Sequence, residues 1–272
     1  MDMPTIKITY SDSRYKPNAE VLASKLNLPL VDSAEISQQS AQNGQTDYYL
    51  EYASDGLCLR SAVRNEHGPI RCDFNSGAST HRRKYGGGNG QAIAKAVGVS
   101  GKFAPQVLDL TAGMGGDGFV LATLGCEILL LERNPVVHSL LDDGLQRAAI
   151  AGLEDTEFAA IAARISLLDT DAGTYLKALP AEPCADIIYL DPMFPERKKS
   201  AKVKKEMQAF HGIVGGDEDA SELLELSLAR ARYRVVVKRS SSAGYLADTA
   251  PSYSLEGKST RFDVFALQKL PG

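Results

Sequence analysis

The stretch Val107-Leu-Asp-Leu-Thr-Ala-Gly-Met-Gly-Gly-Asp-Gly118 decides the fold of this chain. It begins as an apolar strand and runs into a glycine-rich turn that opens a helix, an arrangement that holds nucleotide-like ligands in α/β proteins. Because glycine has no side chain, the backbone of such a turn can pass close to a ligand. The stretch therefore predicts an open α/β sheet with a ligand at the carboxyl end of this strand.

A second stretch, Asp186-Ile-Ile-Tyr-Leu-Asp-Pro-Met-Phe-Pro195, indicates what that ligand is for. Asp191 follows a buried apolar run, so we expect it at a carboxyl end of the same sheet, where α/β enzymes place their catalytic groups. The pattern Asp-Pro-x-Phe resembles the [Asn/Asp/Ser]-Pro-Pro-[Tyr/Phe] motif of methyltransferases that act on exocyclic amino groups. Met193 stands where that motif usually has its second proline.

The chemistry of amine methylation requires residues of these types. An aniline-like amine is a poor nucleophile because its lone pair is delocalised into the ring. Hydrogen bonds from its N–H groups to Asp191 and to the carbonyl of Pro192 would localise that lone pair, and Phe194 can stack on the base. We therefore predict Asp191, Pro192 and Phe194 as the catalytic residues, acting chiefly through proximity and orientation.

The glycine-rich turn by itself fits two cofactors. Gly113, Gly115 and Gly118 match the G-x-G-x-x-G pattern of NAD-binding proteins. Asp109, however, gives Asp-x-x-x-Gly-x-Gly, which resembles motif I of the S-adenosylmethionine-dependent methyltransferases. Glu132 ends the next predicted strand, and a carboxylate there can accept hydrogen bonds from both ribose hydroxyls. Together with the Asp-Pro motif, this spacing predicts S-adenosylmethionine as the cofactor.

Composition sets the limits for the rest of the chain. Its 272 residues are 44% hydrophobic and 24% charged, which is typical of a globular protein. No apolar run approaches the length of about 20 residues that a membrane-spanning helix needs, and the N-terminus lacks export features, so we expect a cytoplasmic protein. The four cysteines and four histidines are dispersed, which predicts no metal site. The oligomeric state stays open.

Periodicity predicts two domains, 1–76 and 77–272. The first reads as a small α+β domain with a strand at 6–10, a helix at 18–26, a hairpin of 47–53 and 57–63, and a further strand at 70–74. The second alternates strands and helices, which favours a mostly parallel, doubly wound sheet. Its strands are predicted at 106–110, 127–131, 164–168, 186–190 and 234–238, its helices at 91–97, 117–124, 135–150, 173–179 and 221–231, and an antiparallel hairpin at 253–255 and 261–267.

Local basic segments flank the two decisive stretches, although the net charge of the chain is −4. Basic loops beside the pocket would hold a nucleic-acid backbone while the target base enters the site. The candidate RNA-binding residues are Arg82, Arg83, Lys84, Lys198, Lys199, Lys202, Lys238 and Arg239.

Several runs together resemble the bacterial ribosomal RNA small subunit methyltransferase J family. They are His81-Arg-Arg-Lys-Tyr-Gly-Gly-Gly88, Leu131-Glu-Arg-Asn-Pro-Val-Val137, Leu140-Leu-Asp-Asp-Gly-Leu145, Tyr189-Leu-Asp-Pro-Met-Phe-Pro195, Val203-Lys-Lys-Glu-Met207 and Val235-Val-Val-Lys-Arg239. The resemblance covers about Ser76 to the C-terminus and is weaker before it. It implies a Rossmann-like class I methyltransferase sheet and methyl transfer to the N2 amine of a guanosine in 16S rRNA. The implied partner is 16S rRNA or the small ribosomal subunit.

The resemblance also implies which residues contact the cofactor. Together with the motif residues, the predicted set is Asp109, Gly113, Gly115, Gly116, Asp117, Glu132, Arg133, Asp171, Ala172 and Asp191. A familiar member of the family has Arg at the position of Gly116 and a Ser-Ser pair at Asp171-Ala172. Asp169 is therefore an alternative to Asp171 as the carboxylate near the base.

Three other functions compete with this interpretation. An N6-adenine or glutamine-N5 methyltransferase would share the motif chemistry. An NAD-dependent oxidoreductase would use the glycine turn but would leave the Asp-Pro-Met-Phe pattern unexplained. A non-catalytic RNA-binding protein would have no need to keep Asp109, Glu132 and Asp191 together.

Overall fold

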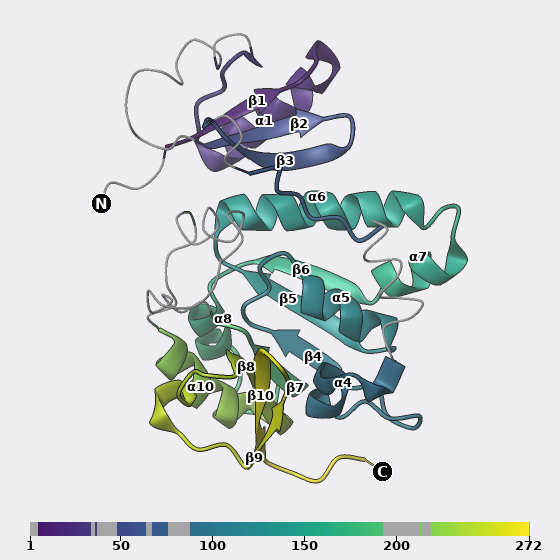
Figure 1. Cartoon of the computed structure of the whole chain (residues 1–272), viewed down its shortest axis with the longest axis vertical. Helices are drawn as coiled ribbons and strands as arrows, with labels where there is room; N and C mark the ends of the chain where they lie inside the picture. Colours follow the sequence, from purple (N-terminus) through teal and green to yellow (C-terminus); the bar gives the residue numbers. More distant parts are fainter. Residues whose placement is uncertain are drawn as a thin grey trace. The chain divides into compact units, whose positions relative to one another are not determined.

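The computed structural model describes residues 5–33, 36, 48–63, 67–75, 88–192, 213 and 219–271 (Figure 1). These residues form two compact units. The first unit contains the described residues up to Cys72, those from Asn134 to Arg147 and residue 213, and the second contains 73–75, 88–133, 148–192 and 219–271. The predicted domain boundary at residue 76 lies outside the described residues and stays a prediction.

The first unit is built on a three-stranded sheet of order β1-β2-β3. Its elements are β1 (Ile6–Tyr10), η1 (Ser13–Tyr15), α1 (Lys16–Leu26), β2 (Tyr48–Ala53) and β3 (Gly56–Ser61). β1 and β2 are parallel, and β2 and β3 form the predicted antiparallel hairpin. Gly56, whose φ is +102°, closes that hairpin in a conformation that favours glycine. The predicted strand at 70–74 is wrong, because there only Ile70 pairs, in an isolated bridge with Leu59.

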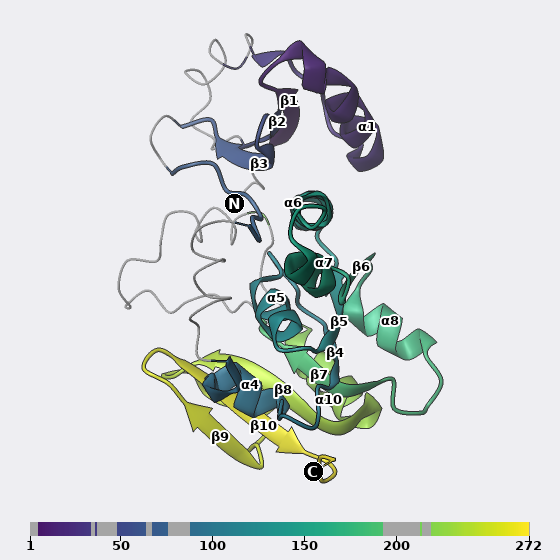
Figure 2. The ribbon, with the colours of Figure 1, turned by 90° about the vertical axis from the view of Figure 1, so that its right-hand side faces the viewer.

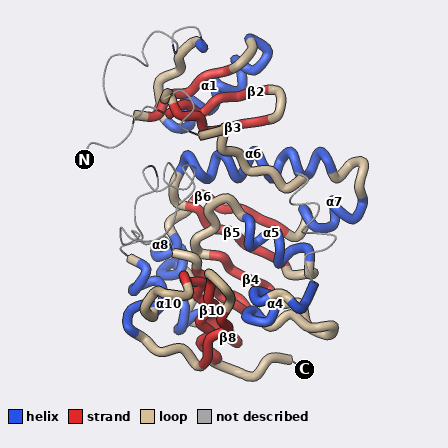
Figure 3. The backbone as a smooth tube through the Cα atoms, viewed as in Figure 1, coloured by secondary structure: helices blue, strands red, loops and turns tan. Residues whose placement is uncertain are grey.

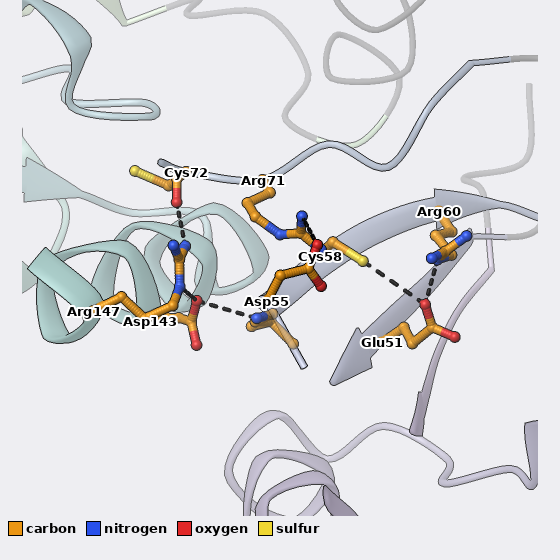
Figure 4. A network of polar contacts seen from close by, with 9 residues as sticks. Glu51, Asp55, Cys58, Arg60, Arg71, Cys72, Asp143 and Arg147 are labelled. Carbon is orange, nitrogen blue, oxygen red and sulfur yellow. Dashed lines mark hydrogen bonds and ion pairs between the residues drawn. The ribbon is translucent and has the colours of Figure 1, made fainter. Parts of the chain in front are cut away.

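A polar network connects the hairpin of the first unit to α6 (Pro135–Ala151), most of which belongs to the same unit (Figure 4). The backbone N–H of Leu57 donates to Asp143 Oδ2 at 3.1 Å, and Arg147 Nε lies 2.8 Å from the same oxygen. Arg147 also donates to the carbonyl of Cys72. Two further ion pairs in the network are Glu51–Arg60 and Arg71–Asp55. The helix thus provides hydrogen-bond partners for the backbone of Leu57 in β3 and of Cys72.

The second unit is built on a seven-stranded sheet of order β6-β5-β4-β7-β8-β10-β9. Its strands are drawn in red in Figure 3. Its strands are β4 (Gln106–Asp109), β5 (Glu127–Glu132), β6 (Ile165–Asp169), β7 (Ala185–Leu190), β8 (Ala231–Ser240), β9 (Tyr253–Glu256) and β10 (Thr260–Ala266). The first five strands in this order are parallel, and β10 is antiparallel to both β8 and β9. The predicted doubly wound sheet with an antiparallel C-terminal hairpin is therefore confirmed.

Helices cover both faces of this sheet (Figure 2). They are α4 (Ala92–Val97), α5 (Gly116–Thr123), α7 (Thr156–Ala162), α8 (Ala172–Ala178) and α10 (Ala220–Arg230), with short turns η2 (Gly88–Gly90) and η3 (Leu246–Asp248). α8 and α10 pack against each other on one face, whereas α4, α5 and α7 lie on the other. Within the described part of the chain, we find no helix with the length and apolar character needed to cross a membrane.

The core of the second unit lies around its central strands. The central strands bury both of their faces, so their sequences are continuous apolar runs instead of alternating ones. Ile187, Ile188 and Leu190 of β7 and the segment Val235–Val237 of β8 are completely inaccessible to solvent. Helix α7 was not predicted, and it begins after Asp155, whose side chain accepts the N–H of Phe158 as an N-cap.

Candidate active site

The candidate residues converge at one edge of the second unit's sheet. β4 ends at Asp109, β5 at Glu132, and β7 at Leu190, just before Asp191. Because these strands and β8 are parallel, their carboxyl ends lie on the same side. The strand order reverses between β4 and β7, and that point of an open sheet is where α/β proteins bind their ligands.

The glycine-rich turn follows β4 and leaves room beside it. Gly113 and Gly115 have φ values of +55° and +68°, which residues with a side chain rarely adopt. A Cβ added at Gly113 or Gly116 would meet no atom within 4 Å, so both positions face open space. At Gly118 an added Cβ would lie 2.7 Å from Leu130 Cδ2, so this glycine serves close packing of α5 on β5. The open positions allow a ligand to approach the backbone.

Glu132 occupies the position expected for a ribose-binding carboxylate. Glu132 is only 7% exposed, and its Oε2 accepts a hydrogen bond from the backbone N–H of Gly113 at 2.9 Å. The hydrogen bond orients the carboxylate beside the glycine turn. A carboxylate with several lone pairs in this place fits the diol of a nucleoside cofactor.

Asp109 is buried beneath the turn, with only 3% of its surface exposed. Its Oδ1 accepts the backbone N–H of Thr111 at 3.0 Å. Burial, together with the neighbouring charges of Asp117 and Asp191, raises the pKa of Asp109 to about 8 against the opposing effects of the Thr111 hydrogen bond and Lys238. At neutral pH this carboxyl group is therefore largely protonated.

A charged network joins the turn to the Asp-Pro motif. Lys238 Nζ lies 2.7 Å from Asp117 Oδ2 and 2.8 Å from Asp191 Oδ2. Tyr189 donates its hydroxyl to Asp117 Oδ2 at 2.7 Å. Burial alone would lower the pKa of Lys238, but the charges and hydrogen bonds of both carboxylates raise it above its usual range. Burial and the same two carboxylates raise the pKa of Tyr189.

A second group of charges lies at the carboxyl ends of β5 and β6. Asp171 caps α8 by accepting the N–H of Thr174 at 2.8 Å, which lowers the pKa of this carboxyl. Arg133 Nη1 lies 2.7 Å from Asp219 Oδ2 and 3.8 Å from Asp171 Oδ2. Asp169, the alternative to Asp171, faces Glu132 in the β5–β6 register. Ala172 is buried as the first residue of α8.

The structure places the predicted RNA-binding residues unevenly. Arg82, Arg83, Lys84, Lys198, Lys199 and Lys202 lie outside the described residues, as does the predicted catalytic Phe194. Arg239 donates to the carbonyl of Gly244 from Nε and Nη2, at 3.3 and 3.1 Å. Burial and the charge of Arg261 lower the pKa of Arg239. Lys238 engages two carboxylates, as described above.

Three residues of the site were not predicted: Thr111, Tyr189 and Asp219. Thr111 lies within the quoted glycine stretch, and Tyr189 is the single hydroxyl in an aliphatic strand that ends beside Asp191. Both were recognisable as polar side chains next to a motif. Asp219 had no such signal, because its contact with Arg133 joins segments 86 residues apart.

The fold and the site together define an S-adenosylmethionine-dependent class I methyltransferase. Residues 31–267 match the family described as "Putative SAM-dependent methyltransferase". The chain is 51% identical over 260 residues to the ribosomal RNA small subunit methyltransferase J of Cellvibrio japonicus, covering 95% of this chain and 96% of that protein. The corresponding protein of Pseudomonas aeruginosa strain UCBPP-PA14 is 47% identical over 248 residues, which cover 91% of this chain and 89% of that protein. The chain belongs to the ribosomal RNA small subunit methyltransferase J family.

A solved structure agrees with this assignment. The crystal structure of an S-adenosylmethionine-dependent methyltransferase from Neisseria gonorrhoeae superposes with a TM-score of 0.68 at 36% identity. The match covers 96% of this chain and 95% of that one. The methyltransferase fold and the cofactor predicted from the sequence are thereby confirmed.

Proposed function

We propose that this enzyme transfers a methyl group from S-adenosylmethionine to the exocyclic N2 amine of a guanosine in 16S rRNA, in the cytoplasm. Family membership supports an RNA of the small subunit as substrate. The observation that carries the amine chemistry is the position of Asp191 beside the glycine turn, linked to it through Lys238 and Asp117. The target base itself rests on the family resemblance.

The proposal assigns the cofactor to the open side of the glycine turn. Gly113, Gly115 and Gly116 would allow close approach of the methionine part, and Glu132 would accept hydrogen bonds from the ribose hydroxyls. Asp117, Arg133, Asp171 and Ala172 stay proposed contacts at the rim. When bound, the cofactor would supply an electrophilic methyl group carried on a sulfonium. The electron pair of the C–S bond would stay on the sulfur when this methyl group is transferred.

The chain's own residues then prepare the amine. Asp191 and the carbonyl of Pro192 accept hydrogen bonds from the N2 amino group, which concentrates its lone pair toward the incoming methyl. The new N–C bond forms as the C–S bond breaks, and the nitrogen afterwards releases one proton to water. Phe194 is proposed to stack on the guanine. Phosphate contacts are proposed for Arg239 and for the six basic residues that lie outside the described part of the chain.

A labelled-transfer assay tests the function. Small subunits from cells that lack this modification, and the same subunits already methylated, are incubated with the enzyme and methyl-labelled S-adenosylmethionine. Label should appear in 16S rRNA of the unmodified subunits only, and nuclease digestion should yield N2-methylguanosine. Free 16S rRNA, run in parallel, identifies the preferred form of the substrate. Absence of label from both RNA forms, or label on adenine, contradicts the proposal.

The competing functions predict other outcomes. An N6-adenine or glutamine-N5 methyltransferase would label DNA or protein in a substrate panel. An NAD-dependent oxidoreductase would bind NAD in calorimetry more tightly than S-adenosylmethionine, and a non-catalytic RNA-binding protein would bind neither. Membership of the ribosomal RNA small subunit methyltransferase J family favours none of these three alternatives.

A further inference from the structure

Lys238 is placed by the sheet itself. It follows the solvent-inaccessible segment Val235–Val237 near the carboxyl end of β8. In the parallel ladder, Leu190 of β7 is opposite Val237. The residues that come next in the chain are Asp191 and Lys238. The register of the two strands therefore brings the lysine beside the Asp-Pro motif, independently of the loops that follow.

The ammonium of Lys238 is engaged inside the site. It is within hydrogen-bond distance of carboxylates from two other elements, Asp117 of α5 and Asp191 after β7. Tyr189 donates to the same oxygen of Asp117 that Lys238 contacts. A lysine that binds phosphate needs its ammonium available to solvent, whereas this one already spans the cofactor turn and the catalytic motif.

The local charge balance explains why a cation is needed here. Three carboxyl groups lie near one another, those of Asp109, Asp117 and Asp191. The negative charges of Asp117 and Asp191 raise the pKa of Asp109. Neighbouring carboxylates disfavour each other's ionised form. Tyr189 adds a buried hydroxyl to the same group. Lys238 hydrogen-bonds to two of these three carboxyl groups, and Arg239 adds a second positive charge that interacts with Asp191.

We propose that Lys238 is a positioning residue for methyl transfer. It holds the Asp191 carboxylate ionised and oriented toward the target amine, and it aligns that carboxylate with the glycine turn through Asp117. The inference rests on the proposed amine methylation and replaces, for this one residue, the predicted contact with RNA phosphate. Lys238 acts through Asp191 and does not itself touch the reacting atoms.

The test compares Lys238→Met with Lys238→Arg and with Lys177→Met. Met removes the charge at similar length, Arg keeps the charge, and Lys177 of α8 forms an exposed ion pair with Glu222 of α10. Single-turnover and steady-state rates are measured on unmodified small subunits between pH 6 and 9. A misplaced catalytic group costs about 100-fold in rate. We expect Lys238→Met to lower kcat by about that factor with little change in KM for RNA, and Lys177→Met to behave as wild type.

The pH profile separates positioning from mere support of the fold. In Lys238→Met, Asp191 faces Asp109, Asp117 and Tyr189 without the lysine, and of the two neighbouring cations only the charge of Arg239 is kept, so the acidic limb of the kcat profile should move to higher pH. Lys238→Arg should restore both the rate and the limb in large part. A thermal melt and calorimetry with S-adenosylmethionine report whether each variant is folded. A lower melting temperature with unchanged kcat and pH profile overturns the inference.

Further outcomes also test the positioning role of Lys238. A raised KM for RNA at unchanged kcat, with a shallower salt dependence, would identify a phosphate contact and overturn the proposed role. If Lys238→Met does not fold, Asp117→Asn removes one anchor of the lysine, and wild-type kcat in that variant overturns the alignment through Asp117. Wild-type enzyme that transfers no label overturns the proposed function and this inference together. Active wild type beside a fully active Lys238→Met overturns the inference alone.

Discussion

The backbone N–H of Asp191 donates to the hydroxyl oxygen of Thr111 at a distance of 2.6 Å. Thr111 lies in the glycine stretch that follows β4, and Asp191 begins the Asp-Pro motif that follows β7. The cofactor turn and the catalytic motif are therefore joined by a direct hydrogen bond as well as through Lys238. Displacement of either segment would displace the other.

Substitution of Thr111 by Val should separate catalysis from cofactor binding. Val keeps the shape but leaves the Asp191 N–H without this acceptor, at a cost of about 1–3 kcal/mol. We expect kcat to fall at least tenfold while the Kd for S-adenosylmethionine, measured by calorimetry, stays near the wild-type value. Thr111→Ser retains the hydroxyl and should retain most of the activity. Equal kcat values for the Val and Ser variants would contradict the role of this hydrogen bond.

Replacement of Asp191 by Ala should abolish turnover in a folded protein. The variant loses the acceptor for the target amine, and we expect at least a 100-fold fall in rate. Asp191→Asn keeps one acceptor oxygen, and Asn is an accepted first residue of the related amino-methyltransferase motif, so its loss should be smaller. Rates of label transfer, compared with thermal melts of the three proteins, check this. Substantial activity in Asp191→Ala would rule out the assigned role.

Glu132 should control affinity for the cofactor and leave the chemical step intact. Loss of hydrogen bonds to a charged group costs about 1.5–3 kcal/mol, which corresponds to roughly 10- to 100-fold in Kd. We expect that weakening for Glu132→Ala, and less for Glu132→Gln, which keeps an oxygen that can accept the Gly113 N–H. Calorimetry gives Kd, and rates at saturating cofactor should approach wild type. An unchanged Kd in Glu132→Ala would refute a ribose contact.

Two glycines of α5 form a matched pair for stability. Alanine at Gly116 meets open space, whereas alanine at Gly118 meets the buried side chain of Leu130. Overpacking costs about 1–3 kcal/mol, partly offset in a helix by the higher propensity of alanine, worth about 1 kcal/mol. Gly116→Ala should therefore be neutral or slightly stabilising, and Gly118→Ala destabilising by comparison. Urea unfolding measures both, and equal midpoints would show that Leu130 moves aside without cost.

Asp109 should make stability depend on pH. Its pKa is raised from 3.8 to about 8, so between these values the folded state holds a proton that the unfolded state has released. Its contribution to the free energy of unfolding is complete below about pH 4 and is lost as pH rises toward 8, by at most about 1.4 kcal/mol per pH unit. Asp109→Asn cannot titrate, so its stability relative to wild type should increase from pH 5 to 8. Parallel urea midpoints for both proteins across that range would contradict the raised pKa.

The parallel sheet was predictable because burial on both faces gives continuous apolar runs. The predicted strand at 186–190 corresponds to Ala185–Leu190, and the predicted hairpin at 253–267 to β9 and β10. Segment 70–74 was predicted as a strand because its side chains are apolar at alternate positions, but Cys72 and Phe74 are buried without ladder pairing. Alternation reports burial, and pairing depends on which neighbour is within reach.

The acidic members of the site could be predicted from motif spacing, whereas their partners could not. Asp109, Glu132 and Asp191 each end or follow a strand, so topology alone brings them to one edge. Lys238 also ends an apolar run, yet its sequence neighbour Arg239 favoured an assignment to RNA. Its pairing with Asp117 and Asp191 depends on strand order, which a single sequence does not specify. The strand order would have been needed to recognise that Lys238 lies at the carboxyl end of the strand that pairs with β7.

Lys238 comes 121 residues after Asp117 and 47 after Asp191. A chain emerging from the ribosome thus exposes the glycine turn and the Asp-Pro motif well before β8 is available. Long-range strand pairing of this kind forms late, since its loop must close first. Catalytic competence should therefore arise only after β8 has been synthesised and has paired with β7.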